Sequence, residues 1–215
     1  MTVRWVGAQR DVLGGDVQGK LSLRSMAHLS HLYGLGPRAG VSGEITIFDG
    51  VPSVARVLDG KVVVEASFDH DACFLVWAEV AAWTEARQPD AIDGETVLEQ
   101  AVLEAAQAAS LDPLQPLVFL VRAPAADATF HVLDKRDGLP HTPALHERAK
   151  VRFGVAGQAV EVLGFCSSEH RGVFTPRDSN LHMHLRTADG RMSGHVEALS
   201  VAPGAVIAVP ARRAR

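Results

Sequence analysis

Three histidines near the C-terminus fall where a short β-hairpin would bring their rings together. His182 and His184 are two residues apart, so on a strand they share one face. The pair Asp189-Gly190 follows and favours a two-residue type I′ turn, because both residues tolerate a positive φ. A turn centred there puts His195 directly opposite residue 184, with Cβ atoms about 5 Å apart. The spacing therefore predicts a hairpin with three imidazoles on one face.

Such a face is typical of a metal site. Three neutral imidazoles with an open fourth position indicate a catalytic zinc site, since structural zinc sites are usually closed by four protein ligands. We therefore predict that His182, His184 and His195 bind Zn²⁺ or a similar divalent ion. The same register places Glu197 opposite His182, where it would supply an acid or hold the second nitrogen of a ligand histidine. The alternative is a half-exposed strand with ordinary polar histidines and a surface glutamate.

The overall composition restricts the class of partner. The chain has 215 residues, of which 47% are hydrophobic, and a formal net charge of −4. This slight imbalance argues against binding to nucleic acid or to an acidic membrane surface. The first seven residues lack an apolar core and residues 74–83 are interrupted by Glu79, so we expect no secretory signal and no membrane span. Cys73 and Cys166 form no Cys-x-x-Cys motif and suit reduced thiols in a cytoplasmic protein.

Strand patterns occupy the first part of the chain. Apolar residues at three-residue spacing predict a short helix over residues 22–32, on which His28 and His31 form a plain surface pair. Residues 43–48, 53–58 and 61–66 are strand-like and are separated by two Asp-Gly turns, which favours an antiparallel meander. Residues 73–83 are apolar at nearly every position, and their periodicity fits a buried strand and a helix equally.

A long helix and a proline-rich break follow. Residues 95–110 are alanine-rich with helical spacing, and Asp112-Pro113 ends this helix. We therefore predict two domains, residues 1–111 and 112–215. Beyond the break, residues 117–122 and 129–133 are expected to be strands, and residues 154–165 a further pair. The predicted fold class is α/β in the mixed (α+β) sense, with two mixed or antiparallel sheets and a few helices.

The hairpin sequence also resembles a known family. Residues 182–196 are similar to the zinc hairpin of the α-acetolactate decarboxylases, which typically shows His-Leu-His, an Asp-Arg turn and Gly-Gly-His-Val. Upstream, residues 33–36 (Tyr-Gly-Leu-Gly) and 42–50 look like the family's Phe-Gly-Leu-Gly and Asp-Gly-Glu-x-x-x-x-Asp-Gly segments. A weaker match joins Phe130, Arg136 and Pro140 to the family's Gly-x-Phe and Arg-Ser-Val-Pro pairing. The matches run in order along nearly the whole chain.

The resemblance implies a bidomain, usually dimeric enzyme with zinc between its domains, which decarboxylates 2-acetolactate to acetoin. Carried over by residue, the three histidines become the metal ligands. Glu44 becomes the acid/base carboxylate, and Arg136 the cationic partner near the substrate. These residue types suit the reaction, because a carboxyl group must protonate the enediolate and an arginine orients a carboxylate well. The alternatives are that Glu44 is a solvent-facing strand residue and that Arg136, beside Lys135 and Asp137, is a charged residue of a turn.

Two departures from the family pattern keep other functions open. Pro37-Arg38 stands where the family has Thr-Phe, and residues 209–215 lack the family's second glutamate, for which Glu197 is the substitute. The first alternative is a family member that binds a metal and a small hydroxy-keto acid without the reaction. The second is a cupin-like metal enzyme, although cupins expect a glutamate a few residues after the second histidine and residues 186–189 supply none.

Overall fold

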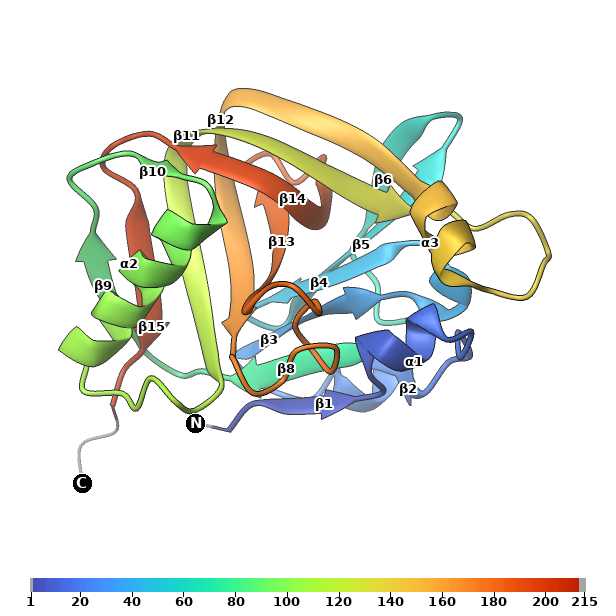
Figure 1. The fold of residues 1–215 in the computed structure, drawn as a ribbon, viewed down its shortest axis with the longest axis horizontal. Coiled ribbons are helices and arrows are strands. Elements are labelled where there is room, and N and C mark those ends of the chain that lie inside the picture. The colour runs from blue at the N-terminus through green and yellow to red at the C-terminus, as the bar shows by residue number, and fades with distance from the viewer. Residues whose placement is uncertain (1, 213–215) are drawn as a thin grey trace.

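Two large antiparallel sheets, a small sheet of two strands (β2 and β7) and three α-helices make up the computed structural model, which describes residues 2–212 (Figure 1). The elements are β1 (Arg4–Val6), α1 (Gln9–Leu13), β2 (Leu21–Ser22), β3 (Leu32–Pro37), β4 (Glu44–Phe48), β5 (Val51–Leu58), β6 (Lys61–Glu65), β7 (Asp71–Ala72), β8 (Leu75–Glu79), β9 (Trp83–Arg87), β10 (Ile92–Asp93), α2 (Glu95–Ala108), β11 (Leu117–Leu133), α3 (Pro143–Ala149), β12 (Lys150–Cys166), β13 (Leu181–Thr187), β14 (Ser193–Val201) and β15 (Val206–Pro210). The predicted class, two sheets with few helices, is confirmed.

The first sheet has the order β1-β8-β3-β4-β5-β6 and contains the predicted meander. β4, β5 and β6 are joined by the turns Asp49-Gly50 and Asp59-Gly60, and all four of these residues have a positive φ between 48° and 77°. Positive φ at both central positions is the signature of a type I′ turn, whose twist matches that of the flanking strands. The local turn chemistry therefore sets the register of β4, the strand that carries Glu44.

The second sheet has the order β10-β14-β13-β12-β11-β15-β9. β14 also pairs with β11, so β11, β12, β13 and β14 close into a ring of four strands. β11 pairs with β15 through its first half and with β14 through its second half, which requires a strand of its length. The predicted histidine hairpin is the β13–β14 part of this ring.

Several predicted elements merge or change type. The two strands expected at 117–122 and 129–133 are one strand, β11, and the pair expected at 154–165 is the single strand β12. The pairing of β11 with β12 shifts register on both sides of Ala126, which accommodates Pro124, a residue without a backbone N–H. For residues 73–83 the sequence left strand and helix equally open. The structure shows strand, since most of these residues lie in β8 and at the start of β9.

The helix expected over residues 22–32 is wrong. Only Leu23–Met26 are helical, as one 3₁₀ turn, and Leu32 already begins β3. The three-residue spacing that suggested an α-helix equals the period of a 3₁₀ turn, and Leu23 and Met26 are buried on its inner side. Residue 32 instead pairs with Glu79 of β8, so sheet formation overrides the local pattern.

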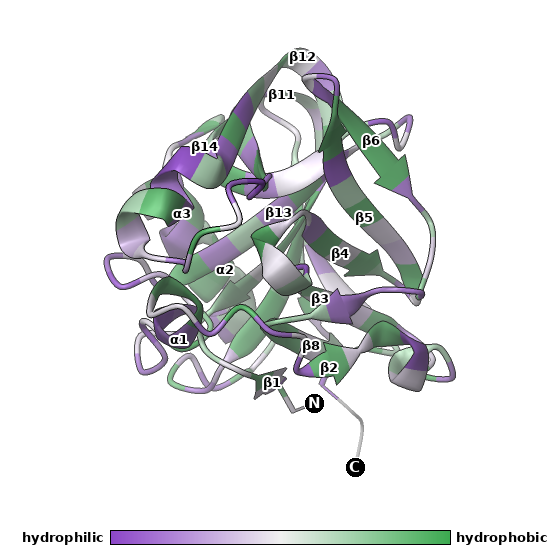
Figure 2. Cartoon of the chain, turned by 90° about the vertical axis from the view of Figure 1, so that its right-hand side faces the viewer, coloured by the Kyte–Doolittle hydropathy of each residue, from purple (hydrophilic) through white to green (hydrophobic). Residues whose placement is uncertain are grey.

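The two sheets pack face to face through a shared apolar core. One buried cluster joins side chains of β3 and β8, such as Leu35 and Val76, to side chains of β11 and β12, such as Leu120 and Phe165. In Figure 2, β12 is banded in green and purple, as expected for a strand with only part of its surface in the core.

The predicted domain boundary at residue 111 does not coincide with the change from one sheet to the other. β9 and β10 precede residue 111 yet belong to the second sheet, so sheet membership changes after β8. The division into two domains at residue 111 stays a prediction. Within residues 2–212, no helix is long and apolar enough to cross a membrane.

Candidate metal centre

The three histidines of the hairpin converge between the two sheets. His184 and His195 are directly opposed in the β13–β14 ladder, as predicted. Ligand nitrogens of His182, His184 and His195 all lie within 4.8 Å of one another, and Nε2 of His182 is 3.1 Å from Nδ1 of His195. Two nitrogens that bind one zinc ion at about 2.0 to 2.1 Å in tetrahedral geometry are about 3.4 Å apart. The cluster therefore has the dimensions of a three-histidine metal site.

The turn that sets this register differs in detail from the prediction. Only Gly190 has a positive φ, and the amide of Gly190 donates to the carbonyl of Thr187. Thr187 N–H in turn donates to the carbonyl of Met192, so the loop is longer than a two-residue type I′ turn. The carboxylate of Asp189 accepts hydrogen bonds from the Thr187 hydroxyl and the Arg191 amide. The loop keeps the same centre, which preserves the opposition of His184 and His195.

Neighbouring groups hold two of the imidazoles with one nitrogen turned inward. Nδ1 of His182 lies 2.8 Å from the carbonyl of Phe174, and Nδ1 of His184 lies 3.0 Å from the hydroxyl of Thr46. With a hydrogen on each Nδ1, both rings would donate to these oxygens and keep the lone pair of Nε2 for a metal ion. Nε2 of His184 is buried and has no hydrogen-bond partner among the described residues. An unpartnered buried nitrogen in such a cluster fits a bound cation.

Burial keeps these imidazoles neutral. It lowers the pKa of His182 to about 4 and the pKa values of His184 and His195 well below the ordinary histidine value, and the neighbouring histidines act in the same direction. Neutral imidazole is the form that a metal ion requires, so these histidines could bind an ion near neutral pH without first losing protons. The donor set of three nitrogens suits zinc and similar borderline metals.

Glu44 lies beside the histidines at the start of β4. Its side chain is buried, with Oε2 3.6 Å from Nε2 of His184, and its Oε1 atom has no hydrogen-bond partner among residues 2–212. Burial raises the pKa of this carboxyl well above its ordinary value, against smaller lowering effects from a Leu133 backbone hydrogen bond and the charge of Lys150. In the absence of a nearby cation, Glu44 is therefore a protonated acid facing the cluster.

A fourth histidine, His131, joins the site from β11 and was missed in the sequence. It pairs with His195 across the β11–β14 ladder, and the two rings stack with centroids 4.6 Å apart. Nε2 of His131 is 3.9 Å from Oε1 of Glu44. A polar residue between the apolar residues Phe130 and Val132 was the available signal, but nothing local pairs residue 131 with residue 195.

Glu197 lies behind His131 and does not line the cavity. The β11–β14 pairing passes from Thr129–Ala198 to Phe130–Val196, so Glu197 forms a bulge and turns away from the expected face. The β13–β14 ladder ends at His184–His195 and does not pair residues 182 and 197. The carboxylate of Glu197 lies 3.0 Å from Nδ1 of His131 and accepts a 2.7 Å bond from Arg152, and these contacts lower its pKa to about 2. It is thus an ionised group that orients His131.

The structure does not bring Arg136 to the histidines. Its exposed guanidinium donates to Asp134 at 2.8 Å and to the Val57 carbonyl at 2.7 Å, within the turn that follows β11. These contacts raise the pKa of Arg136, with the Asp134 hydrogen bond as the main cause. The side chain is not part of the cavity lining described next, so the sequence-based role for Arg136 has no geometric support.

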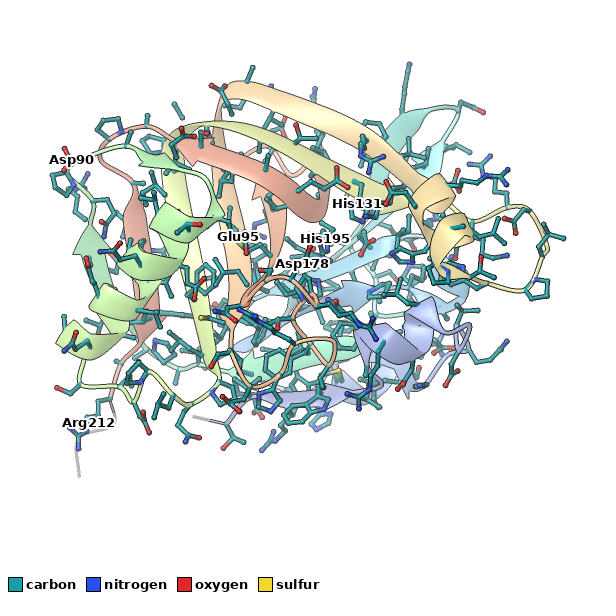
Figure 3. All side chains as sticks on the ribbon, viewed as in Figure 1. Asp90, Glu95, His131, Asp178, His195 and Arg212 are labelled. Atoms are coloured by element: carbon teal, nitrogen blue, oxygen red, sulfur yellow. The ribbon has the colours of Figure 1, made fainter. Side chains whose placement is uncertain are left out.

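A cavity of about 240 Å³ opens onto the cluster and connects it to solvent. Its floor includes Glu44, His131, His182 and His195, and Phe74 stacks on the ring of His182 with centroids 5.8 Å apart. The segment between β12 and β13 forms part of its wall; Figure 3 labels Asp178 on this segment beside His195 and His131. The site is therefore a small, partly apolar pocket with three imidazoles and the carboxyl of Glu44 at its base.

Comparison with known proteins gives a fold and no sequence family. No protein-family model matches the chain, and no curated protein matches its sequence. Among solved structures, a Staphylococcus aureus protein of unknown function similar to α-acetolactate decarboxylase superposes with a TM-score of 0.75 at 14% identity, over 97% of this chain and 85% of that one.

Two acetolactate decarboxylase structures give similar results. The enzyme of Bacillus subtilis strain 168 superposes with a TM-score of 0.73 at 15% identity, over 97% of this chain and 86% of that one. The enzyme of Bacillus subtilis subspecies spizizenii gives the same TM-score and identity over 99% and 87% of the two chains. The chain therefore has the fold of α-acetolactate decarboxylase along nearly its whole length, in agreement with the resemblance found in the sequence.

Proposed function

We propose that the protein is a zinc-dependent carboxy-lyase that decarboxylates 2-acetolactate to acetoin. The observation that carries this proposal is the convergence of His182, His184 and His195 beside the buried carboxyl of Glu44, at a cavity that is lined by Glu44, His182 and His195. The shared fold with α-acetolactate decarboxylases supports it. We also propose that the protein acts on its small-molecule substrate in the cytoplasm as a homodimer, as the sequence resemblance implies.

The histidines would hold the ion through the nitrogens that face one another, with at least one position open to substrate. When bound, zinc supplies a Lewis acid that polarises the ketone and the neighbouring hydroxyl and stabilises the enediolate by several kcal/mol. In the reaction, the bond between the carboxylate carbon and C2 breaks, its electron pair moves toward the ketone, and CO₂ leaves. One proton must then be added to carbon to give acetoin.

Glu44 is the residue suited to give that proton. Burial raises the pKa of this carboxyl and so favours the form that carries a proton, and its Oε1 has no hydrogen-bond partner among the described residues. His131 lies 3.9 Å from this atom and is held by the ionised Glu197, so it is placed to return a proton to Glu44. In this proposal Glu197 is a positioning residue and not the second acid that its sequence position suggested.

The direct test is to quantify the metal in the purified protein and to assay acetoin formation from racemic acetolactate. Stoichiometric zinc and acetoin formation that stops after chelation and returns with added Zn²⁺ would support the proposal. Stoichiometric metal without acetoin would instead favour a family member that binds a hydroxy-keto acid without decarboxylating it. One observation favours this second candidate: Arg136, the expected substrate-binding arginine, is not part of the cavity lining.

A further inference from the structure

Positive side chains surround the mouth of the cavity. Its lining includes three cationic residues, Arg10, Lys150 and Arg177, and two acidic residues, Glu44 and Asp178. Glu44 is buried, so among the exposed residues of the lining the two arginines, Arg10 and Arg177, outnumber the one carboxylate, that of Asp178. The excess of positive charge at the opening would attract an anion and raise its local concentration.

Two of these cations come from segments that the backbone ties together. The Arg10 amide donates to the carbonyl of Gly172 at 3.0 Å, and the Gln9 amide donates to the carbonyl of Val173 at 2.8 Å. These bonds join the start of α1 to the segment between β12 and β13, which carries Arg177 (Figure 1). Arg10 and Arg177 are thereby held at the same opening although they are far apart in the sequence.

Of the three cations in the lining, Arg10 and Arg177 are the two without a close ion-pair partner. Lys150 already donates to Glu147 at 2.8 Å and lies 3.7 Å from Glu197. Arg10 is 3.9 Å from Asp11 and Arg177 has no carboxylate within 4.0 Å in the part of the chain that the structure describes. A guanidinium presents a planar set of donors that matches a carboxylate, so an incoming acid can be bound by either side chain or by both.

We propose that Arg10 and Arg177 form the carboxylate-binding site of the cavity and bind the acid group of a small 2-hydroxy acid whose hydroxyl reaches the histidine cluster. This inference rests on the proposed function for the identity of the acid, and it assigns to these arginines the part that the sequence resemblance gave to Arg136. A volume of about 240 Å³ equals the space of about eight liquid waters, which suits such a molecule. With the carboxylate at the mouth, CO₂ would leave directly toward solvent.

The test measures binding and does not depend on catalysis. The zinc-loaded protein is titrated calorimetrically with 2-hydroxy-2-methylpropanoate, which has the hydroxyl and carboxylate but no ketone, and with acetoin, which is neutral. We expect Arg10→Gln and Arg177→Gln each to raise the Kd of the acid by about 3- to 10-fold, the double variant to raise it further, and the Kd of acetoin to stay unchanged. Thermal unfolding and metal content serve as checks that the variants retain fold and ion.

Two matched controls separate this site from general charge effects. Arg171→Gln removes a charge from the same segment at a residue outside the cavity lining, where Arg171 is bonded to Asn180. Arg136→Gln tests the residue suggested by the resemblance. The inference is overturned if the acid does not bind the parent protein or if the double variant binds the acid as tightly as the parent does. It is also overturned if, among the single variants, only Arg136→Gln raises the Kd of the acid, or if the arginine variants raise the Kd of the acid and of acetoin equally. Arginine-dependent acid binding without acetoin formation would retain the site and reject the decarboxylase function.

Discussion

The hydroxyl of Thr46 lies 3.0 Å from Nδ1 of His184 and itself accepts a 3.2 Å hydrogen bond from Ser193. This contact links β4 of one sheet to β13 of the other and fixes which nitrogen of His184 faces the cluster. We expect Thr46→Val to lower zinc affinity by about 10- to 100-fold, the range for loss of a group that orients a metal ligand. Competition with a chromophoric chelator measures the change. Thr46→Ser, which keeps the hydroxyl, should bind zinc like the parent, and equal affinity in all three proteins would argue against this role.

Replacing His195 by alanine should abolish stoichiometric metal binding, because two imidazoles cannot complete the site. Elemental analysis of the purified variant, dialysed against zinc and then against metal-free buffer, measures this. His28→Ala is the matched control, since His28 is exposed and does not belong to the cluster. Undiminished metal in the His195 variant would reject the assignment of the ligands.

Glu44→Gln should leave metal content intact and lower acetoin turnover by about 10² to 10⁴, the usual contribution of a proton-transfer group. The amide has the shape of the carboxyl but cannot give up a proton at useful rates. Glu79→Gln, at the exposed end of β8, provides a control of equal chemistry. Turnover within a few-fold of the parent would mean that Glu44 is only a buried strand residue.

The contact between Glu197 and His131 gives a further prediction. Glu197→Gln should lower turnover by about tenfold with unchanged metal content, because His131 loses the charge that orients it and keeps only part of its proton-transfer role. Glu147→Gln is a close control, since Glu147 also binds Arg152 but does not touch His131. If both variants lose the same activity, the effect comes from Arg152 and not from His131.

His146 should make the fold sensitive to mild acid. Burial, followed by the charge of His141, lowers its pKa from 6.5 to about 4, so the unfolded chain binds more protons than the folded protein between these pH values. The free energy of unfolding therefore falls as pH decreases from 6.5 to 4. Urea titrations at pH 7 and pH 5 should show a smaller fall for His146→Gln than for the parent, by up to about 1.4 kcal/mol per pH unit. An unchanged pH dependence would contradict the shift, and His28→Gln is the control.

The parts of the site that the sequence predicts are those set by neighbouring residues. His184 and His195 are brought together by the loop at Asp189-Gly190. Glu44 was identified through the family resemblance of residues 42–50, and the two type I′ turns that follow it set the pairing of its strand. His131 depends on the pairing of β11 with β14, which are more than 60 residues apart along the chain, and no local pattern reports that pairing.

Two further residues show the same limit. The predicted position of Glu197 assumed that alternate residues of the strand share one face. A β-bulge at this position breaks that alternation and turns the side chain away from the expected face. Arg136 follows the family motif in sequence, yet in the fold its turn points the guanidinium to Asp134 and Val57. Arg10 and Arg177 reach the cavity only through backbone bonds between distant segments, so no sequence pattern identifies them.

The ring formed by β11, β12, β13 and β14 has a consequence for how the ion is exchanged. Both edges of the histidine hairpin are engaged, β13 by β12 and β14 by β11, so the ligands are held by main-chain bonds that do not involve metal. Removing the ion then need not melt the hairpin, unlike the small zinc domains that unfold when stripped. The arrangement of the three histidines therefore does not depend on a bound ion, and an ion could enter or leave without refolding of the hairpin.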